Sequence, residues 1–166
     1  MDKKYSTSIW FFVVVAISLL PIQSAFAQNK GVFGYWKTIN KDTGKPEAIF
    51  RLWEDQGKLV GRIVKVFLKP GEKMPLCSDC TGAQRNKPRL GLMGLWGFVR
   101  DDGSDIKWVD GKILNPEDGK VYNSQIDLSE DGKKLNVYGY IRLLVKIGGT
   151  SVWERPTAEE MKDVKL

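Results

Sequence analysis

The sequence predicts an all-β fold, an antiparallel up-and-down β-barrel of about eight to ten strands. Apolar and aromatic residues alternate with polar ones in short runs, as they do along half-buried strands. Turn sequences such as Asp-Gly separate these runs. No run is followed by the long crossover that parallel strands need, and closing the sheet removes its exposed edges. A sandwich of two sheets is the main alternative architecture.

The beginning of the chain has the layout of a secretory signal peptide. A positive start, an apolar core and a small-x-small cleavage site follow one another: Lys3 and Lys4, residues 9–20, and Ala25-Phe26-Ala27. The apolar core is short for a membrane span of about 20 residues, which disfavours an uncleaved anchor. Removing residues 1–27 from the 166 leaves 139, the size of one domain. We expect a signal peptide at 1–27, a single barrel domain at 28–166 without a transmembrane span, and a periplasmic or extracellular location.

The first part of this domain predicts three strands joined by short turns. They cover residues 31–38, 47–54 and 58–68. In the second strand, Ala48, Phe50 and Leu52 alternate with Ile49, Arg51 and Trp53. The following segment, 69–88, has three prolines, both cysteines and no periodicity, so it is predicted to be a long loop.

The second part of the domain predicts further strands separated by acidic-Gly turns. The expected strands cover residues 90–100, 105–109, 112–114, 120–128, 133–144 and 150–155. The Asp-Gly pairs at 110–111 and 118–119 are each expected to reverse the chain, because Asp-Gly adopts the positive φ angles of tight hairpin turns. Gly148-Gly149 is expected to precede the last strand, and Thr157 with Glu160 predicts a capping box on a short C-terminal helical turn.

Composition excludes several classes of activity. The chain has no histidine, which rules out Ser-His-Asp and Cys-His catalysis. Its 26 basic and 20 acidic residues give a formal net charge of +6, but they are interspersed. This pattern disfavours nucleic acid as a partner and leaves weak attraction to anionic surfaces. The sequence therefore favours a protein without enzymatic activity, and we expect no catalytic residues, cofactor or metal site.

Several short sequence motifs follow one another along the chain in an order that is characteristic of one protein family. They are Gly34-Tyr35-Trp36, Gly44-Lys45-Pro46, Cys-Ser-Asp-Cys-Thr-Gly at 77–82, Gly-Lys-Ile-Leu-Asn-Pro-Glu-Asp-Gly-Lys-Val-Tyr at 111–122, Tyr138-Gly139-Tyr140, and 149–155. In these blocks the chain resembles a family of small secreted bacterial proteins catalogued as a domain of unknown function. The resemblance implies a fold and an exported location but no activity. In the region 137–150, Val-Tyr-Gly-Tyr and Gly-Gly-Thr replace the Arg-containing versions that the family pattern implies.

A second resemblance concerns how the barrel closes. Gly34-x-Trp36 at the start of the first strand and Arg155 at the end of the last are similar to the short signature of lipocalin-like barrels. This resemblance implies that Trp36 seals one end of the barrel and that Arg155 lies across its ring. A cation stacked on indole contributes roughly 0.5–2 kcal/mol.

Cys77 and Cys80 are the only cysteines of the sequence. In an oxidising compartment the expected state is a structural disulfide within the long loop. A thiol–disulfide oxidoreductase is the less favoured alternative, because no helical pattern follows the pair to lower a thiol pKa.

The aromatic side chains and a few polar residues within strands are candidates for lining a ligand pocket. These candidates are Trp53, Trp96, Trp108, Arg51, Arg62, Tyr122 and Asn123. The leading hypothesis is a binding module that holds a small apolar or amphipathic ligand inside the barrel. The alternative is a cell-envelope interaction or structural protein with a filled barrel, because eight strands either enclose packed side chains or leave room for one small ligand.

Overall fold

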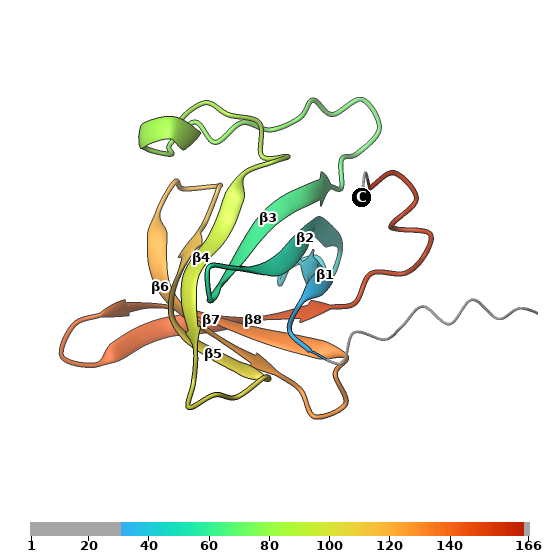
Figure 1. Ribbon diagram of the computed structural model, residues 1–166. Coiled ribbons are helices and arrows are strands. Elements are labelled where there is room, and N and C mark those ends of the chain that lie inside the picture. Colours follow the sequence, from blue (N-terminus) through green and yellow to red (C-terminus); the bar gives the residue numbers. More distant parts are fainter. Residues whose placement is uncertain (1–30, 165–166) are drawn as a thin grey trace, which may run out of the picture.

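A computed structural model describes residues 31–164 as eight antiparallel strands that close into a barrel (Figure 1). The strands are β1 (Gly34–Ile39), β2 (Pro46–Asp55), β3 (Lys58–Val66), β4 (Met93–Arg100), β5 (Lys107–Leu114), β6 (Val121–Leu128), β7 (Lys134–Arg142) and β8 (Lys146–Glu154). The predicted signal peptide lies outside the described residues. Within residues 31–164, no helix is long and apolar enough to cross a membrane.

Every strand pairs with its neighbours in the sequence, and β1 pairs with β8 through Lys37 and Glu154. This topology confirms the predicted up-and-down barrel and excludes the sandwich. The long loop is also confirmed, since the chain leaves β3 at Val66 and re-enters the sheet at Met93. Its one regular element is a short 3-10 helix, Gly82–Gln84.

The Asp110-Gly111 pair does not form the predicted turn. It lies inside β5, where Asp110 has a φ of 56° and the register with β6 shifts between Trp108 and Gly111. The left-handed residue therefore creates a β-bulge, and the two short strands predicted around it are one strand. Gly111 is required for packing as well, because a Cβ there would lie 2.2 Å from the Phe98 ring.

The other Asp-Gly pair reverses the chain as predicted. The β5–β6 connection closes with a hydrogen bond from the Asn115 amide to the Lys120 carbonyl at 2.9 Å, and Gly119 has a φ of +67°. By contrast, the prediction that Gly148-Gly149 precedes the last strand is wrong. Both glycines lie within β8, opposite Tyr140 and Gly139 of β7.

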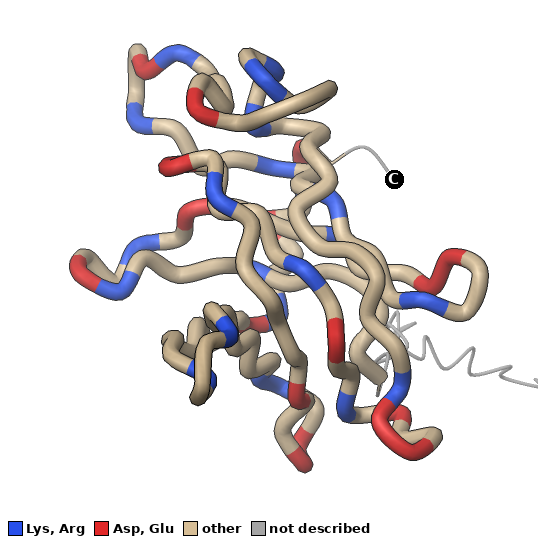
Figure 2. Tube along the Cα trace, turned by 90° about the vertical axis from the view of Figure 1, so that its left-hand side faces the viewer, with Lys and Arg blue, Asp and Glu red and all other residues tan. Residues whose placement is uncertain are grey.

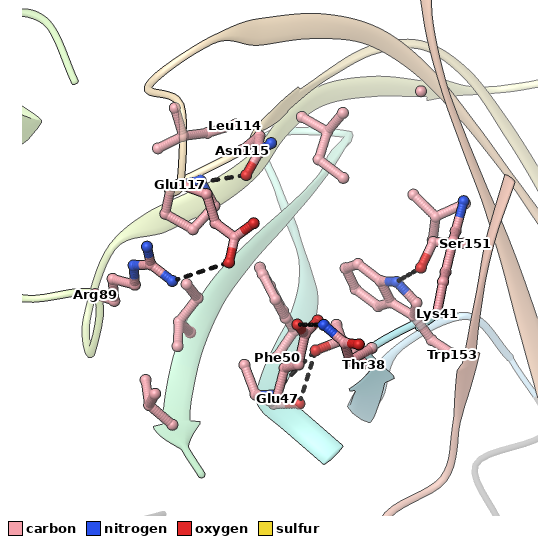
Figure 3. Close-up of a pocket in the computed structure, with 18 of the residues that line it drawn as sticks. Thr38, Lys41, Glu47, Phe50, Arg89, Leu114, Asn115, Glu117, Ser151 and Trp153 are labelled. Atoms are coloured by element: carbon pink, nitrogen blue, oxygen red, sulfur yellow. Dashed lines mark hydrogen bonds and ion pairs between the residues drawn. The ribbon is translucent and has the colours of Figure 1, made fainter. Parts of the chain in front are cut away.

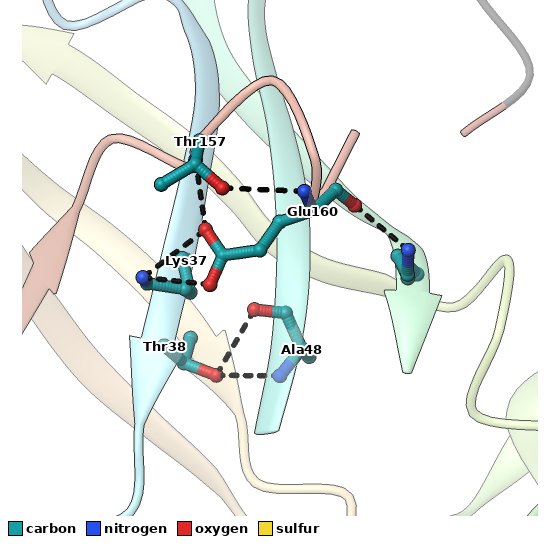
Figure 4. A network of polar contacts seen from close by, with 6 residues as sticks. Lys37, Thr38, Ala48, Thr157 and Glu160 are labelled. Atoms are coloured by element: carbon teal, nitrogen blue, oxygen red, sulfur yellow. Dashed lines mark hydrogen bonds and ion pairs between the residues drawn. The ribbon is translucent and has the colours of Figure 1, made fainter. Parts of the chain in front are cut away.

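The C-terminal segment packs on the outer wall of the barrel, where residues 158–163 form turns in place of a regular helix. Thr157 and Glu160 exchange the two hydrogen bonds of a capping box, but only turns follow (Figure 4). The Glu160 carboxylate also binds Lys37 of β1 at 2.9 Å, and Lys65 of β3 donates to the Glu160 carbonyl. Burial acts to raise the pKa of Glu160, but the hydrogen bond from the Thr157 amide and the Lys37 ammonium outweigh it and lower the pKa. The segment therefore ties β1 to β3.

Alternating residues of the strands point inward and form a core near one end of the barrel. The largest of these side chains are Trp36, Phe98, Trp108, Leu52, Leu59, Leu95, Ile126 and Leu135. The turns at this end are β2–β3, β4–β5 and β6–β7. The opposite end of the barrel is not filled in this way.

Candidate ligand-binding cavity

A cavity of about 1110 Å³ opens at the end of the barrel opposite this core (Figure 3). The connections β1–β2, β3–β4 and β5–β6 contribute to its lining, together with Ile141 and Ile147 at the adjoining ends of β7 and β8. They meet there because each strand of a meander reverses direction, so alternate connections share one end. The volume is slightly above the range of about 300–1,000 Å³ that is usual for small-molecule sites.

The inner wall of the cavity is largely apolar and comes from strands on opposite sides of the barrel. The ring centroids of Phe50 of β2 and Trp153 of β8 lie 4.6 Å apart, with the ring planes tilted by 31°. Val137 of β7 and Ile113 of β5 add aliphatic surface. The Trp153 indole donates a hydrogen bond to the Ser151 hydroxyl at 3.1 Å, so its polar group is satisfied without a ligand.

The rim of the cavity is polar, and its acidic side chains already have partners. Glu47 accepts a hydrogen bond from Asn40 at 2.7 Å, Glu72 accepts one from the Lys69 amide, and Glu117 lies 3.6 Å from Arg89. By contrast, the ammonium groups of Lys41, Lys45 and Lys69 make no hydrogen bond or ion pair with residues 31–164. The mouth therefore presents cationic groups to an incoming molecule.

Tyr122 is the predicted lining residue that contacts the cavity. Its hydroxyl donates to the Asp118 carboxylate at 3.0 Å, and this bond, together with burial, raises the pKa of Tyr122. The phenol thus stays protonated and is fixed against the β5–β6 turn.

The other six predicted lining residues lie elsewhere. Arg51, Trp53 and Arg62 point outward because Phe50 and Leu52 of β2, and Ile63 of β3, occupy the inward positions. Trp96 and Asn123 also lie away from the cavity, and Asn123 accepts a hydrogen bond from Lys112 at 2.6 Å.

Trp108 points inward but at the filled end of the barrel. It is fully buried there, with the Phe33 ring 5.7 Å away and the Arg100 guanidinium 4.8 Å from its ring centre.

Phe50, Val137 and Trp153 are lining residues that the sequence prediction missed. The alternation of inward and outward residues along the strands is the sequence signal that could have identified them. Trp36 marks the inward phase of β1, and its partner opposite in β2 is Phe50. Following the same inward phase around the sheet leads to Trp153 and Val137.

Trp36 and Arg155 lie at the filled end of the barrel. The Arg155 guanidinium is centred 3.6 Å from the Trp36 ring and donates to the carbonyl oxygens of Gly31, Phe33 and Tyr35. Burial lowers the pKa of Arg155 to about 10, which keeps the group charged at neutral pH. The Trp36 indole donates to the Val32 carbonyl at 2.7 Å. This arrangement links the start of β1 to the end of β8.

The sequence profile of a family described as an uncharacterised protein conserved in bacteria, DUF2147, matches residues 34–155. The chain belongs to this family. The match runs from the first residue of β1 to Arg155 and therefore contains the whole barrel.

The DUF2147 chain is also similar to a solved structure, described as protein HP1028 from the human pathogen Helicobacter pylori, which belongs to the lipocalin family. The two chains are 21% identical, with a TM-score of 0.65 over 80% of this chain and 89% of the other. The comparison therefore shows a lipocalin-like fold. A search of curated proteins finds no match.

Cys77 and Cys80 form the predicted disulfide in the β3–β4 loop of the DUF2147 fold. Both residues are buried, and a bridge between Leu76 and Pro88 closes the loop around them. The loop rests on the β5–β6 turn so closely that a Cβ on Gly119 would lie 2.1 Å from the Asp79 carbonyl oxygen. The disulfide thus stiffens a segment whose ends line the cavity mouth.

Proposed function

We propose that this protein is a non-enzymatic carrier or sensor that binds one amphipathic, anionic small molecule in its barrel. The observation that carries the proposal is the cavity of about 1110 Å³, which has an apolar wall and unpaired lysines at its rim. An apolar chain would bury itself against Phe50, Val137 and Trp153. An acidic head group would remain at the mouth near Lys41, Lys45 and Lys69.

The charge of the rim supports an anionic head group over a neutral one. Glu47, Glu72 and Glu117 are engaged by neighbouring groups, whereas the three lysine side chains can reorient towards a ligand. Around the rest of the barrel, basic and acidic residues are interspersed (Figure 2). Cations without a hydrogen bond or ion pair also occur elsewhere on the described surface, for example at Lys58 and Lys73, and those of the rim are distinguished by lying at the mouth of the cavity.

The cavity also favours ligand binding over the filled-barrel alternative. Side chains fill the Trp36 end, but the lining at the other end leaves space that a packed core would not leave. A thiol oxidoreductase is less well supported, since both cysteines are buried and exchange requires access of a partner thiol to a sulfur atom.

The test uses a fluorescent fatty-acid analogue, dansyl-undecanoic acid, and its uncharged methyl ester. The acid should bind with one-to-one stoichiometry and compete with unlabelled fatty acids. Gly139→Phe should abolish binding of both probes, because Gly139 lines the cavity and a side chain there projects towards Ile113 and Tyr122. Gly139→Ala adds only a methyl group in ordinary contact and should reduce binding far less.

A second set of variants tests whether the head group of the ligand is anionic. Replacing Lys41 and Lys45 by glutamine should weaken the acid roughly tenfold while leaving the ester nearly unchanged, because only the acid interacts with the ammonium groups. The outward pair Arg51→Gln and Arg62→Gln is the matched control and should alter neither affinity. Failure of the native protein to bind either probe, with no small molecule found by native mass spectrometry, would contradict the proposed function.

The proposed site of action is the periplasm or the outside of the cell. The signal-peptide layout of residues 1–27 and the structural disulfide support export. Expression in the bacterial host followed by fractionation and intact-mass measurement tests this proposal. A soluble periplasmic or secreted product beginning at Gln28 is expected, and a cytoplasmic product that retains Met1 would overturn it.

A further inference from the structure

The β7–β8 hairpin ends in an unusually apolar tip, which we define as residues 141–147. Its sequence is Ile-Arg-Leu-Leu-Val-Lys-Ile. Leu143, Leu144 and Val145 form the turn and expose 68%, 102% and 65% of their surfaces. Neighbouring Ile141 and Ile147 are about half exposed. Contiguous exposed apolar residues of this kind mark an interaction surface.

Two basic residues stand directly behind the apolar turn. Arg142 and Lys146 pair across the hairpin, one on each strand. No acidic residue occurs from position 132 to 153, and this stretch contains two further basic residues, Lys133 and Lys134. The tip is therefore apolar at its end and cationic at its base.

The shape of the hairpin fits the interfacial region of a bilayer. With a rise of roughly 3.3 Å per residue, Leu144 lies about 7 Å beyond the Arg142–Lys146 pair. Apolar elements that lie in membrane interfaces bury themselves to a depth of about 5–10 Å, with basic groups at the level of the lipid phosphates. The hairpin also projects beyond the body of the barrel (Figure 1), so the tip can enter a surface without a clash from other strands.

We propose that the hairpin tip docks this protein onto the surface of a bilayer that contains anionic phospholipids. A protein partner is less favoured, since a specific interface buries at least about 1,000 Å² and a narrow convex turn offers far less. A bilayer, by contrast, surrounds a projecting turn on all sides, and its phosphates complement Arg142 and Lys146.

Docking at this point would also orient the cavity. Ile141 and Ile147 belong to the tip and line the cavity, so the apolar surface continues from the turn into the barrel. The mouth of the barrel would therefore face the membrane surface. Membrane docking goes beyond ligand binding and does not require that the barrel holds a ligand.

The test is co-sedimentation of the protein, as its host produces it, with vesicles of phosphatidylglycerol and phosphatidylethanolamine or of phosphatidylcholine alone. The native protein should sediment with the anionic vesicles and dissociate at high salt. The double variant Leu143→Asp with Leu144→Asp should lower the partition coefficient roughly tenfold or more, because two apolar side chains no longer enter the interface. Both positions are exposed, so circular dichroism should remain native.

Ile106→Asp is the matched control, since Ile106 is an exposed apolar residue in the β4–β5 turn at the other end of the barrel. It should bind vesicles like the native protein. Because all variants share the same N-terminal segment, the difference between them reports the hairpin alone. Replacing Arg142 and Lys146 by glutamine should remove the preference for anionic vesicles.

Three results would overturn the docking proposal. In the first, the native protein stays in the supernatant with anionic vesicles. In the second, the double aspartate variant binds vesicles as well as Ile106→Asp does. In the third, the native protein is a dimer that does not bind vesicles, and the double aspartate variant is a monomer. The last result would assign the tip to a second copy of the chain. Gly139→Phe separates the two proposals, because it should lose the fatty-acid probe and keep vesicle binding.

Discussion

Arg155 is expected to be one of the most important single side chains for the stability of this barrel. Its guanidinium stacks on Trp36 at 3.6 Å and donates to three backbone carbonyl oxygens that precede or begin β1. The pairing of β1 with β8 is otherwise short, with Lys37 and Glu154 as the register pair. Removing Arg155 therefore weakens the seam at which the barrel closes.

The magnitude follows from these contacts. A hydrogen bond from a charged donor contributes roughly 1.5–3 kcal/mol and a cation–π contact about 0.5–2 kcal/mol. Arg155 is partly exposed, so water replaces some of these interactions after substitution. We expect Arg155→Met to lower the free energy of unfolding by about 3 kcal/mol, a large part of the usual 5–15 kcal/mol. Arg155→Lys should cost roughly half as much, since an ammonium keeps the charge but loses the planar fork.

Urea unfolding followed by tryptophan fluorescence and circular dichroism measures this effect. The matched control is Arg51→Met, which removes an outward arginine whose guanidinium lies 5.8 Å from the Trp53 ring. It should change stability by about 0.5 kcal/mol or less. If Arg155→Met is no more destabilising than Arg51→Met, the argument that this residue closes the barrel is wrong.

Two further predictions concern segments packed against the barrel. The pKa of Glu160 is lowered in the folded state, so its ion pair with Lys37 stabilises the protein above the unfolded carboxyl pKa of about 4.3 and is lost as the pH falls below it. In Glu160→Gln, the urea midpoint of unfolding should therefore fall less steeply as the pH is lowered from neutral than it does in the native protein. An unchanged pH dependence of the midpoint would contradict this. Gly119→Ala should cost about 2 kcal/mol and increase hydrogen exchange in the cysteine loop, because its Cβ would meet the Asp79 carbonyl at a φ of +67°. Gly57→Ala also has a positive φ but faces open space, so it should cost less and leave exchange in that loop unchanged.

Strand periodicity and turn residues are local signals, so the sequence predicted the antiparallel strands and favoured a barrel over a sandwich, which the closed topology then excluded. In residues 47–54, the predicted alternation correctly separates the inward-pointing residues of β2 from the outward-pointing ones, and Asp118-Gly119 forms the expected reversal. Asp110-Gly111 carries the same local preference for positive φ, yet it forms a bulge. Pairing with β4 and β6 on both sides of β5 determined that outcome, and a local signal contains no information about such pairing.

The cavity depended on tertiary structure. Tyr122 was identified as a lining residue from the sequence, but Arg51 and Trp53 were not distinguished from inward residues, because aromatic character does not specify which face of a strand is buried. Phe50 and Trp153 are about a hundred positions apart and meet only because the sheet closes on itself. Local residue patterns predicted the strands and the disulfide, and the resemblance to lipocalin-like barrels predicted the Trp36–Arg155 pair. Closure of the barrel, which joins distant residues, decided where the space for a ligand lies and which lysines remain available at its mouth.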